Sequence, residues 1–205
     1  MKTKLLIGVL CLSFLLTLFA GCAKKEESSS SSVPQTSQSG ESGASSASQS
    51  TSGEDIGDFS AVDLEGNTVT RDIFSGHKVT LVNVWATWCG WCLKEMPELQ
   101  ELSEELKEKG VQIVGIAADA GTAEEVSEEQ LPVVKEVLDQ TGVTYPILIP
   151  DAVLLNGRLS TVTGLPETFF VDENGKILTV FKMGYQDKEG WLKTIDKALK
   201  QVGEG

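Results

Sequence analysis

The chain has 205 residues, and its 17 Lys and Arg residues against 30 Asp and Glu residues give a net charge of −13 at pH 7. So acidic a surface repels the phosphate backbone of DNA and RNA, which excludes nucleic acid as a partner. Residues 55–205 are predicted to form one domain, long enough to bury a hydrophobic core.

Residues 1–21 have the pattern of a secretory signal. Two lysines within the first four residues precede a nearly continuous apolar run, Leu5–Ala20, and small residues come just before Cys22. The run of about 16 residues is shorter than the roughly 20 that a bilayer span requires. The cysteine after Ala-Gly resembles a bacterial lipobox, which implies cleavage before Cys22 and diacylation of it. The alternative is an uncleaved anchor, and both readings place the protein at a membrane, facing outward.

Residues 22–54 follow as a predicted tether. Serine dominates this segment, interleaved with Gln, Gly and Thr, and large apolar residues are almost absent. Burial therefore cannot offset the entropy cost of ordering the chain. A random coil of this length has a mean reach of roughly 30 Å.

The remaining residues alternate between predicted strands and helices. In chain order, hydrophobic periodicity and turn residues predict a hairpin (Phe59–Asp63 with Asn67–Thr70), strand Val79–Trp85, helix Leu93–Lys109, strand Val111–Ala117, helix Glu124–Gln140, strand Tyr145–Ile149, a helical turn at Asp151–Asn156, strands Thr168–Asp172 and Lys176–Lys182, and helix Asp187–Lys200. Pro97 and Pro132 are expected to kink or split their helices. This order predicts an α/β sandwich with a mixed central sheet.

Cys89 and Cys92 lie where the strand ending at Trp85 leads into a helix. A thiol at a helix N-terminus faces unpaired backbone N–H groups and the positive end of the helix dipole, which favour the thiolate. Cys11 falls in the signal and Cys22 is the expected lipid site, so only these two cysteines remain in the domain. In an oxidising compartment they would pair with each other or with a substrate.

Three motifs carry a family resemblance: Asn83-Val84-Trp85-Ala86-Thr87-Trp88-Cys89-Gly90-Trp91-Cys92, Pro97 five places later, and Thr163-Gly164-Leu165-Pro166-Glu167-Thr168-Phe169. Together they resemble the TlpA/ResA-like branch of the thioredoxin superfamily, the membrane-anchored thiol-disulfide oxidoreductases. The resemblance implies a thioredoxin-like three-layer α/β/α sandwich with a mixed central sheet. It also implies an N-terminal β-hairpin over residues 59–70 and a helix/strand insertion within residues 120–157.

The chemistry expected of this pair is thiol-disulfide exchange. Cys89 would attack a substrate disulfide as a thiolate, and Cys92 would attack the resulting mixed disulfide. The resemblance implies a cis peptide before Pro166, packed against the cysteines. The residues expected to contact substrate are Trp88, Trp91, Leu165 and Pro166. For Trp91, a tolerated spacer and an exposed apolar contact remain alternatives.

Proton transfer at this site requires a titratable group other than Asn83. Cytosolic thioredoxins carry a buried aspartate at the position of Asn83, and an amide cannot titrate. Asp119 and Glu167 are the candidate replacements for a proton relay, with ordinary exposed carboxylates as the alternative reading.

Other uses of two cysteines fit less well. A structural zinc site needs about four ligands, and beyond the pair only His77 is available. Haem attachment needs histidine directly after the second cysteine, where Leu93 stands. A peroxiredoxin-like peroxidase would need Pro and Thr where Val82 and Ala86 occur. We therefore predict no metal and no cofactor. The alternatives are a structural disulfide, a dithiol oxidant, a peroxiredoxin-like peroxidase and a client-binding module without redox turnover.

The resemblance also implies a cellular setting. It points to a monomeric lipoprotein on the outer face of the cell membrane of a Gram-positive bacterium, acting as a reductant. Its electrons would come from a membrane electron donor of the CcdA/DsbD type. Its substrates would be protein disulfides, such as those of apocytochrome c, as in cytochrome c maturation, a methionine sulfoxide reductase or other envelope proteins.

Overall fold

The computed structural model describes residues 53–203, so the predicted signal segment, Cys22 and most of the predicted tether lie outside the described residues. Its elements are β1 (Ser60–Val62), β2 (Thr68–Thr70), η1 (Arg71–Phe74), β3 (Val79–Trp85), α1 (Gly90–Leu106), η2 (Lys107–Lys109), β4 (Val111–Ala117), α2 (Leu131–Thr141), β5 (Ile147–Leu148), α3 (Ala152–Asn156), η3 (Arg158–Thr161), β6 (Glu167–Asp172), β7 (Ile177–Met183) and α4 (Lys188–Gly203). Within residues 53–203, no helix is both long and apolar enough to cross a membrane.

The central sheet has five strands in the order β5-β4-β3-β6-β7. β3 runs parallel to β4 and antiparallel to β6, which confirms the predicted mixed sheet. All seven residues of β3 are buried, as expected for a middle strand that is covered on both faces. Because β3 ends at Trp85 and α1 begins at Gly90, the two cysteines lie at one end of the most buried strand.

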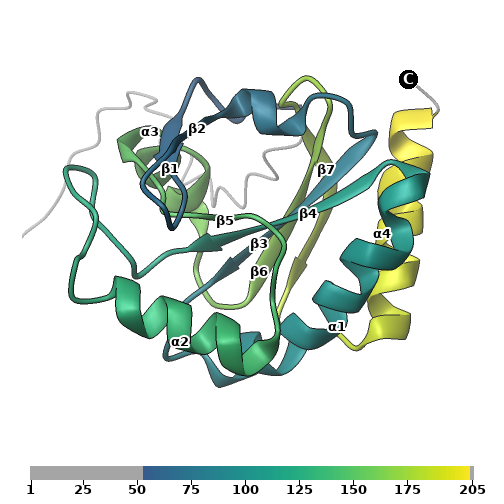
Figure 1. Ribbon diagram of the computed structural model, residues 1–205. Coiled ribbons are helices and arrows are strands. Elements are labelled where there is room, and N and C mark those ends of the chain that lie inside the picture. The colour runs from purple at the N-terminus through teal and green to yellow at the C-terminus, as the bar shows by residue number, and fades with distance from the viewer. Residues whose placement is uncertain (1–52, 204–205) are drawn as a thin grey trace, which may run out of the picture. The chain divides into compact units, whose positions relative to one another are not determined.

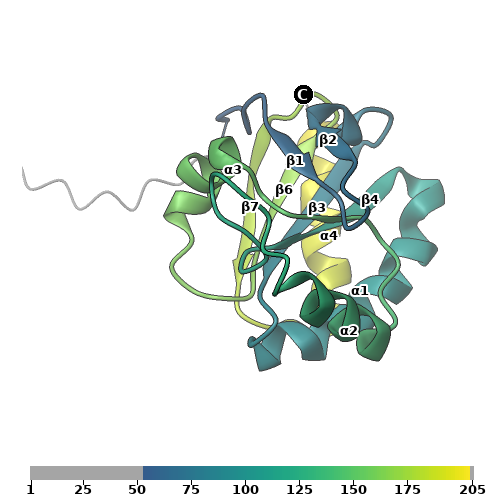
Figure 2. The ribbon, with the colours of Figure 1, turned by 60° about the vertical axis from the view of Figure 1, so that its left-hand side comes forward.

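Helices cover both faces of this sheet (Figures 1 and 2). Leu81 and Trp85 of β3 share a hydrophobic core with residues of α1, α2 and α4. Val82 and Val84 point to the other face, where they share a core with residues of α3 and of the two-stranded β1–β2 sheet. The alternation along β3 therefore builds one core on each side, as a three-layer sandwich requires.

The second predicted helix is shorter than expected. The sequence pattern predicts a helix from Glu124, but α2 begins only at Leu131, and the preceding loop contains an isolated bridge between Gly121 and Val126. Pro132 lies in the first turn of α2 and does not split the helix. A first-turn N–H has no partner inside the helix, so proline costs nothing there. Pro97, in contrast, lies inside α1 as predicted.

Candidate active site

The junction between β3 and α1 places the two cysteines in different environments. Cys89 is the N-cap of α1, and its Sγ accepts a hydrogen bond from the Cys92 backbone N–H at 3.2 Å. The two residues form a disulfide. Cys89 is 5% exposed and Cys92 is fully buried, so only Cys89 offers any surface to a substrate. The first turn of α1 holds no acidic residue, which leaves the helix dipole free to favour a Cys89 thiolate.

Asp119 fixes the loop that leads into Cys89. Its Oδ2 accepts hydrogen bonds from the Thr87 backbone N–H at 3.0 Å, from Thr87 Oγ1 at 2.6 Å and from Gln130 Nε2 at 3.1 Å. This candidate relay carboxylate makes no hydrogen bond to Asn83. Its contacts instead tie the residues before the helix to the loop before α2.

The proline loop lies at the same end of the sheet as the cysteines. The Leu165–Pro166 peptide is cis, as the resemblance implied. The next residue, Glu167, pairs with Val84 of β3, one residue before that strand ends. Glu167 is buried and forms an ion pair of 2.6 Å with buried Arg158. Glu167, the second candidate for the proton relay, is therefore paired with Arg158 and does not bond Asn83.

The buried acid next to Asn83 is Glu95. Asn83 Nδ2 donates to Glu95 Oε1 at 2.8 Å and to Thr168 Oγ1 at 3.1 Å, and Glu95 Oε2 accepts the Gln186 backbone N–H at 3.2 Å. Burial raises the pKa of Glu95 to about 7, although both hydrogen bonds to its carboxylate lower it. Glu95 lies three residues after Cys92 in α1, so the two side chains share one buried face of the helix.

Sequence reasoning missed Glu95, although a signal for it exists. Met96, Leu99 and Leu102 mark the buried face of the first predicted helix, and Glu95 belongs to that face. Charged residues are almost never fully buried without a partner. An acid on the apolar face, combined with a non-titrating Asn83, was the pattern that could have identified it.

Two exposed tryptophans flank the disulfide. Trp88 is 74% exposed and Trp91 is 59% exposed. The Trp91 ring lies 5.7 Å from the Tyr185 ring, and Lys94 Nζ lies 5.1 Å and 4.3 Å from the centres of these two rings. These contacts place Trp91 against the loop before α4 and leave the rest of its ring exposed. Substrate contact by Trp88, Trp91, Leu165 and Pro166 stays a prediction.

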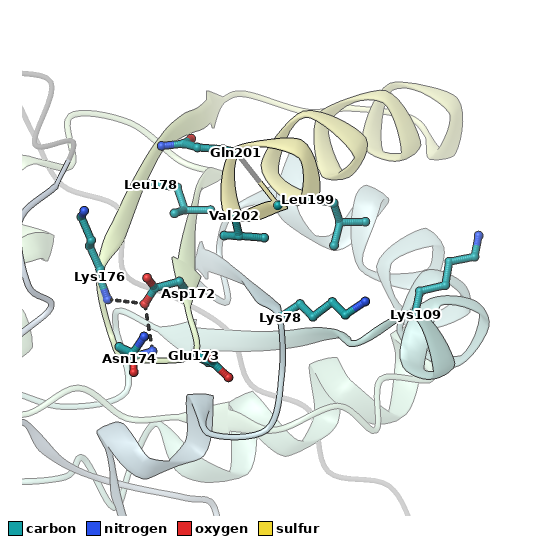
Figure 3. A pocket seen from close by; sticks show the side chains of 11 residues that line it. Lys78, Lys109, Asp172, Glu173, Asn174, Lys176, Leu178, Leu199, Gln201 and Val202 are labelled. Carbon is teal, nitrogen blue, oxygen red and sulfur yellow. Dashed lines mark hydrogen bonds between the residues drawn. The ribbon is translucent and has the colours of Figure 1, made fainter. Parts of the chain in front are cut away.

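A separate pocket of about 690 Å³ lies at the other end of the sheet (Figure 3). Lys78, just before the start of β3, lines it together with Asp172 at the end of β6, whereas the cysteines follow the end of β3. No cysteine lines this pocket, so we assign it no part in disulfide exchange. Within residues 53–203, no group of three His, Cys, Asp or Glu side chains is placed to hold a metal ion.

Comparisons with known proteins agree with this geometry. The family model described as Redoxin matches residues 51–199. A thiol:disulfide interchange protein of the thioredoxin family from Chlorobium tepidum is 27% identical, with a TM-score of 0.58 over 72% of this chain and 96% of that one. A second C. tepidum structure, described as thiol:disulfide interchange protein DsbE, is 29% identical, with a TM-score of 0.57 over 72% and 97%.

StoA from Bacillus subtilis is 22% identical, with a TM-score of 0.52 over 68% of this chain and 97% of that one. A similarity of 22% identity supports the fold alone. This fold is the thioredoxin-like fold that the motifs implied. The search of curated proteins found no match.

Proposed function

Because the chain belongs to the redoxin family and is a thiol-disulfide oxidoreductase of the thioredoxin type, we propose that it reduces disulfides in proteins outside the cytoplasm. The observation that carries this proposal is the pairing of Cys89, at the start of α1, with Cys92, one turn further along the same helix. One sulfur can meet a substrate while the other stays buried, which is what a two-step exchange needs.

The reaction proceeds in two displacements. In the reduced enzyme the Cys89 thiolate attacks one sulfur of a substrate disulfide, and the other substrate sulfur leaves as a thiolate that takes a proton from water. Cys92 then loses its proton and attacks Cys89 Sγ, which forms the enzyme disulfide and releases the second substrate thiolate. Two electrons pass from the cysteine pair to the substrate, and a membrane dithiol donor must return them.

Glu95 is the base we assign to the second displacement. Its carboxylate lies on the helix face of Cys92, and its pKa of about 7 allows it to gain and lose a proton near neutral pH. It takes the Cys92 proton as the mixed disulfide is resolved and returns it to solvent afterwards. Asn83 and the Gln186 backbone N–H hold the carboxylate in place for this step.

The proposed reductive direction is supported by the small number of groups that would stabilise the Cys89 thiolate besides the helix dipole. Strong dithiol oxidants owe their potential to a strongly stabilised reduced form. Here the Cys92 backbone N–H is the hydrogen-bond donor to Cys89 Sγ in the described part of the chain. The nearby cation, Lys94, lies instead over the Trp91 and Tyr185 rings. With the helix dipole and one backbone N–H as its stabilising groups, the Cys89 thiolate has less support than in a strong oxidant, which favours the reducing role.

The reduction potential of the Cys89–Cys92 pair tests this direction. We expect equilibration of the protein with glutathione buffers to give a value close to the roughly −270 mV of thioredoxin. A value near the roughly −120 mV of a strong oxidant such as DsbA would contradict the reductive assignment and support dithiol oxidation instead.

The cellular setting is part of the same proposal. Residues 1–21 act as a signal peptide, Cys22 carries the lipid, and residues 22–54 tether a thioredoxin-like domain of residues 55–205 to the outer face of the cell membrane. Electrons reach Cys89 and Cys92 from a membrane donor of the CcdA/DsbD type. The substrates are envelope proteins with accessible disulfides, among them apocytochrome c and methionine sulfoxide reductase.

A Cys22→Ser variant tests the anchor. Without the acceptor sulfur no diacylglyceryl group can be added, so we expect the protein to leave the membrane fraction or to remain as an unprocessed precursor. Membrane fractionation with detergent phase partitioning measures this. The matched control is Cys11→Ser, which removes a cysteine from the signal and keeps the lipid site. Equal membrane association and equal processing of both variants would contradict lipidation at Cys22.

A further inference from the structure

Several buried polar atoms of the described residues lack a protein partner, and three of them lie in the core under α1. Asn83 Oδ1, Trp85 Nε1 and the Tyr145 hydroxyl are each fully buried, and none has a hydrogen-bonding group within reach among residues 53–203. Leaving such groups unpaired costs free energy, so each calls for an explanation. All three belong to the core between the sheet and α1.

Two of these groups, the side chains of Trp85 and Tyr145, lie against Gly115. This residue lies beside Asn83 in the parallel pairing of β3 with β4. A Cβ at Gly115 would lie 3.1 Å from Trp85 Nε1 and 3.3 Å from Tyr145 Cε2. Because glycine has no side chain, both rings can lie against this residue, which neighbours Asn83 in the sheet. The same Cβ would lie 2.5 Å from Ile147 Cδ1, so the local packing requires glycine here.

These groups have the chemistry that an internal water needs. A buried water typically makes two to four hydrogen bonds to otherwise unpaired polar groups. Asn83 Oδ1 can accept a bond from it, Trp85 Nε1 can donate one, and the Tyr145 hydroxyl can do either. We propose that Tyr145 is a positioning residue: with Trp85 it holds one water on Asn83 Oδ1, and this water fixes the Asn83 NH₂ group toward Glu95. The inference rests on the proposed function, because it concerns the base assigned there.

The orientation of the Asn83 amide matters for Glu95. With Nδ2 toward the carboxylate, Asn83 donates a hydrogen bond that favours the charged form of Glu95. A half-turn of the amide would point Oδ1 at the carboxylate and disfavour that form. Hydrogen-bond donors on the side of the amide away from Glu95 hold Oδ1 there. Glu95 therefore keeps the hydrogen bond from Nδ2, which favours the charged form that can accept a proton.

Tyr145 is itself placed by the helix that carries Glu95. Gln100 Oε1 of α1 accepts the backbone N–H groups of Thr144 at 2.8 Å and of Tyr145 at 3.3 Å. Burial raises the pKa of the Tyr145 phenol far above its usual range, so the hydroxyl stays neutral. It therefore acts as a hydrogen-bonding group and not as a second titrating site.

Several other groups face Glu95 and contribute to its titration. Glu98 on α1 raises its pKa, and Lys182 on β7 lowers it. Tyr185, in the loop before α4, also interacts electrostatically with Glu95. Cys92 lies one turn before Glu95 and titrates once the disulfide is reduced. The test must therefore isolate the route through Asn83.

The Tyr145→Phe substitution removes the hydroxyl and keeps the ring. We expect the apparent pKa in the pH–rate profile for resolution of the mixed disulfide to rise by about 0.5 to 1 unit. In an Asn83→Ala background the same substitution should move the profile no further, because the route through the amide is already lost. The control is Thr80→Val, which removes a buried hydroxyl that bonds Gln112; it should leave the profile unchanged.

The outcomes separate this inference from the proposed function. If Glu95→Gln abolishes the pH transition but Tyr145→Phe does not move it, the positioning role is overturned and Glu95 remains the base. An equal shift from Tyr145→Phe with and without Asn83 also overturns the positioning role. If Glu95→Gln leaves the transition intact, the proposed base is wrong. A high-resolution crystal structure should show one water within hydrogen-bond distance of Asn83 Oδ1, Trp85 Nε1 and the Tyr145 hydroxyl, and a dry site there overturns the inference.

Discussion

A Cys89→Ser variant is expected to lose disulfide-reductase activity by about 10³-fold or more. A serine hydroxyl does not ionise near neutral pH and is a far weaker nucleophile than the thiolate that the start of α1 favours. Cys92 cannot take over the first attack, because it is fully buried. Insulin reduction with dithiothreitol as the electron source measures the loss.

The companion variant Cys92→Ser separates the two steps. It keeps the attacking thiol and removes the resolving one, so mixed disulfides through Cys89 should accumulate and be recoverable from cells after acid quenching. Cys89→Ser is the matched control and should trap nothing. Equal insulin reduction by the wild type and the Cys89→Ser variant would contradict the enzymatic assignment. Failure of the Cys92→Ser variant to trap any client would favour a binding module without redox turnover.

Replacing Glu95 with Gln is expected to change both stability and rate. The pKa of Glu95 is about 7 in the folded protein against 4.5 for the unperturbed group, so the native state holds a proton that the unfolded chain releases. Stability therefore falls as pH rises from about 4.5 to 7, by up to about 3 kcal/mol. The glutamine side chain of the variant carries no charge. Its NH₂ group faces the Gln186 backbone N–H, and this pairing of two donors lowers the stability by about 1 kcal/mol.

Glu95→Gln should thus raise the free energy of unfolding by about 2 kcal/mol at pH 8 and not at pH 4. Urea denaturation of the oxidised protein at both pH values measures this, with exposed Glu108→Gln as the control. The same variant should slow resolution of the mixed disulfide by about 10²-fold at pH 7, because Cys92 loses its base. Equal pH dependence of stability in the wild type and the variant would contradict a buried, titrating Glu95.

Most of the fold could be predicted from local patterns. The continuous apolar run of β3 predicted a strand buried on both faces, and the structure confirms it. The predicted start of the second helix at Glu124 is wrong, because Pro132 lies in the first turn of α2 and does not interrupt a longer helix. Local sequence does not distinguish these two uses of proline, since both lie within an otherwise helical pattern.

The sequence by itself determined the reactive pair. The count and spacing of cysteines, and the change from an apolar strand to an amphipathic helix, left Cys89 and Cys92 as neighbours at a helix N-terminus. Those features are local, since residues three apart on one helix are held by backbone geometry alone. The cis proline loop was implied by a motif and confirmed at Leu165–Pro166.

Only the tertiary structure decided which acid serves this pair. Asp119 and Glu167 were the sequence candidates. Asp119 instead bonds Thr87, 32 residues away in the chain, and Glu167 bonds Arg158, nine residues away. Glu95 meets Asn83 because α1 packs on the face of β3 that carries the amide. The pKa of a carboxylate depends on its burial and on partners brought together by packing, and neither quantity is encoded in a short stretch of sequence.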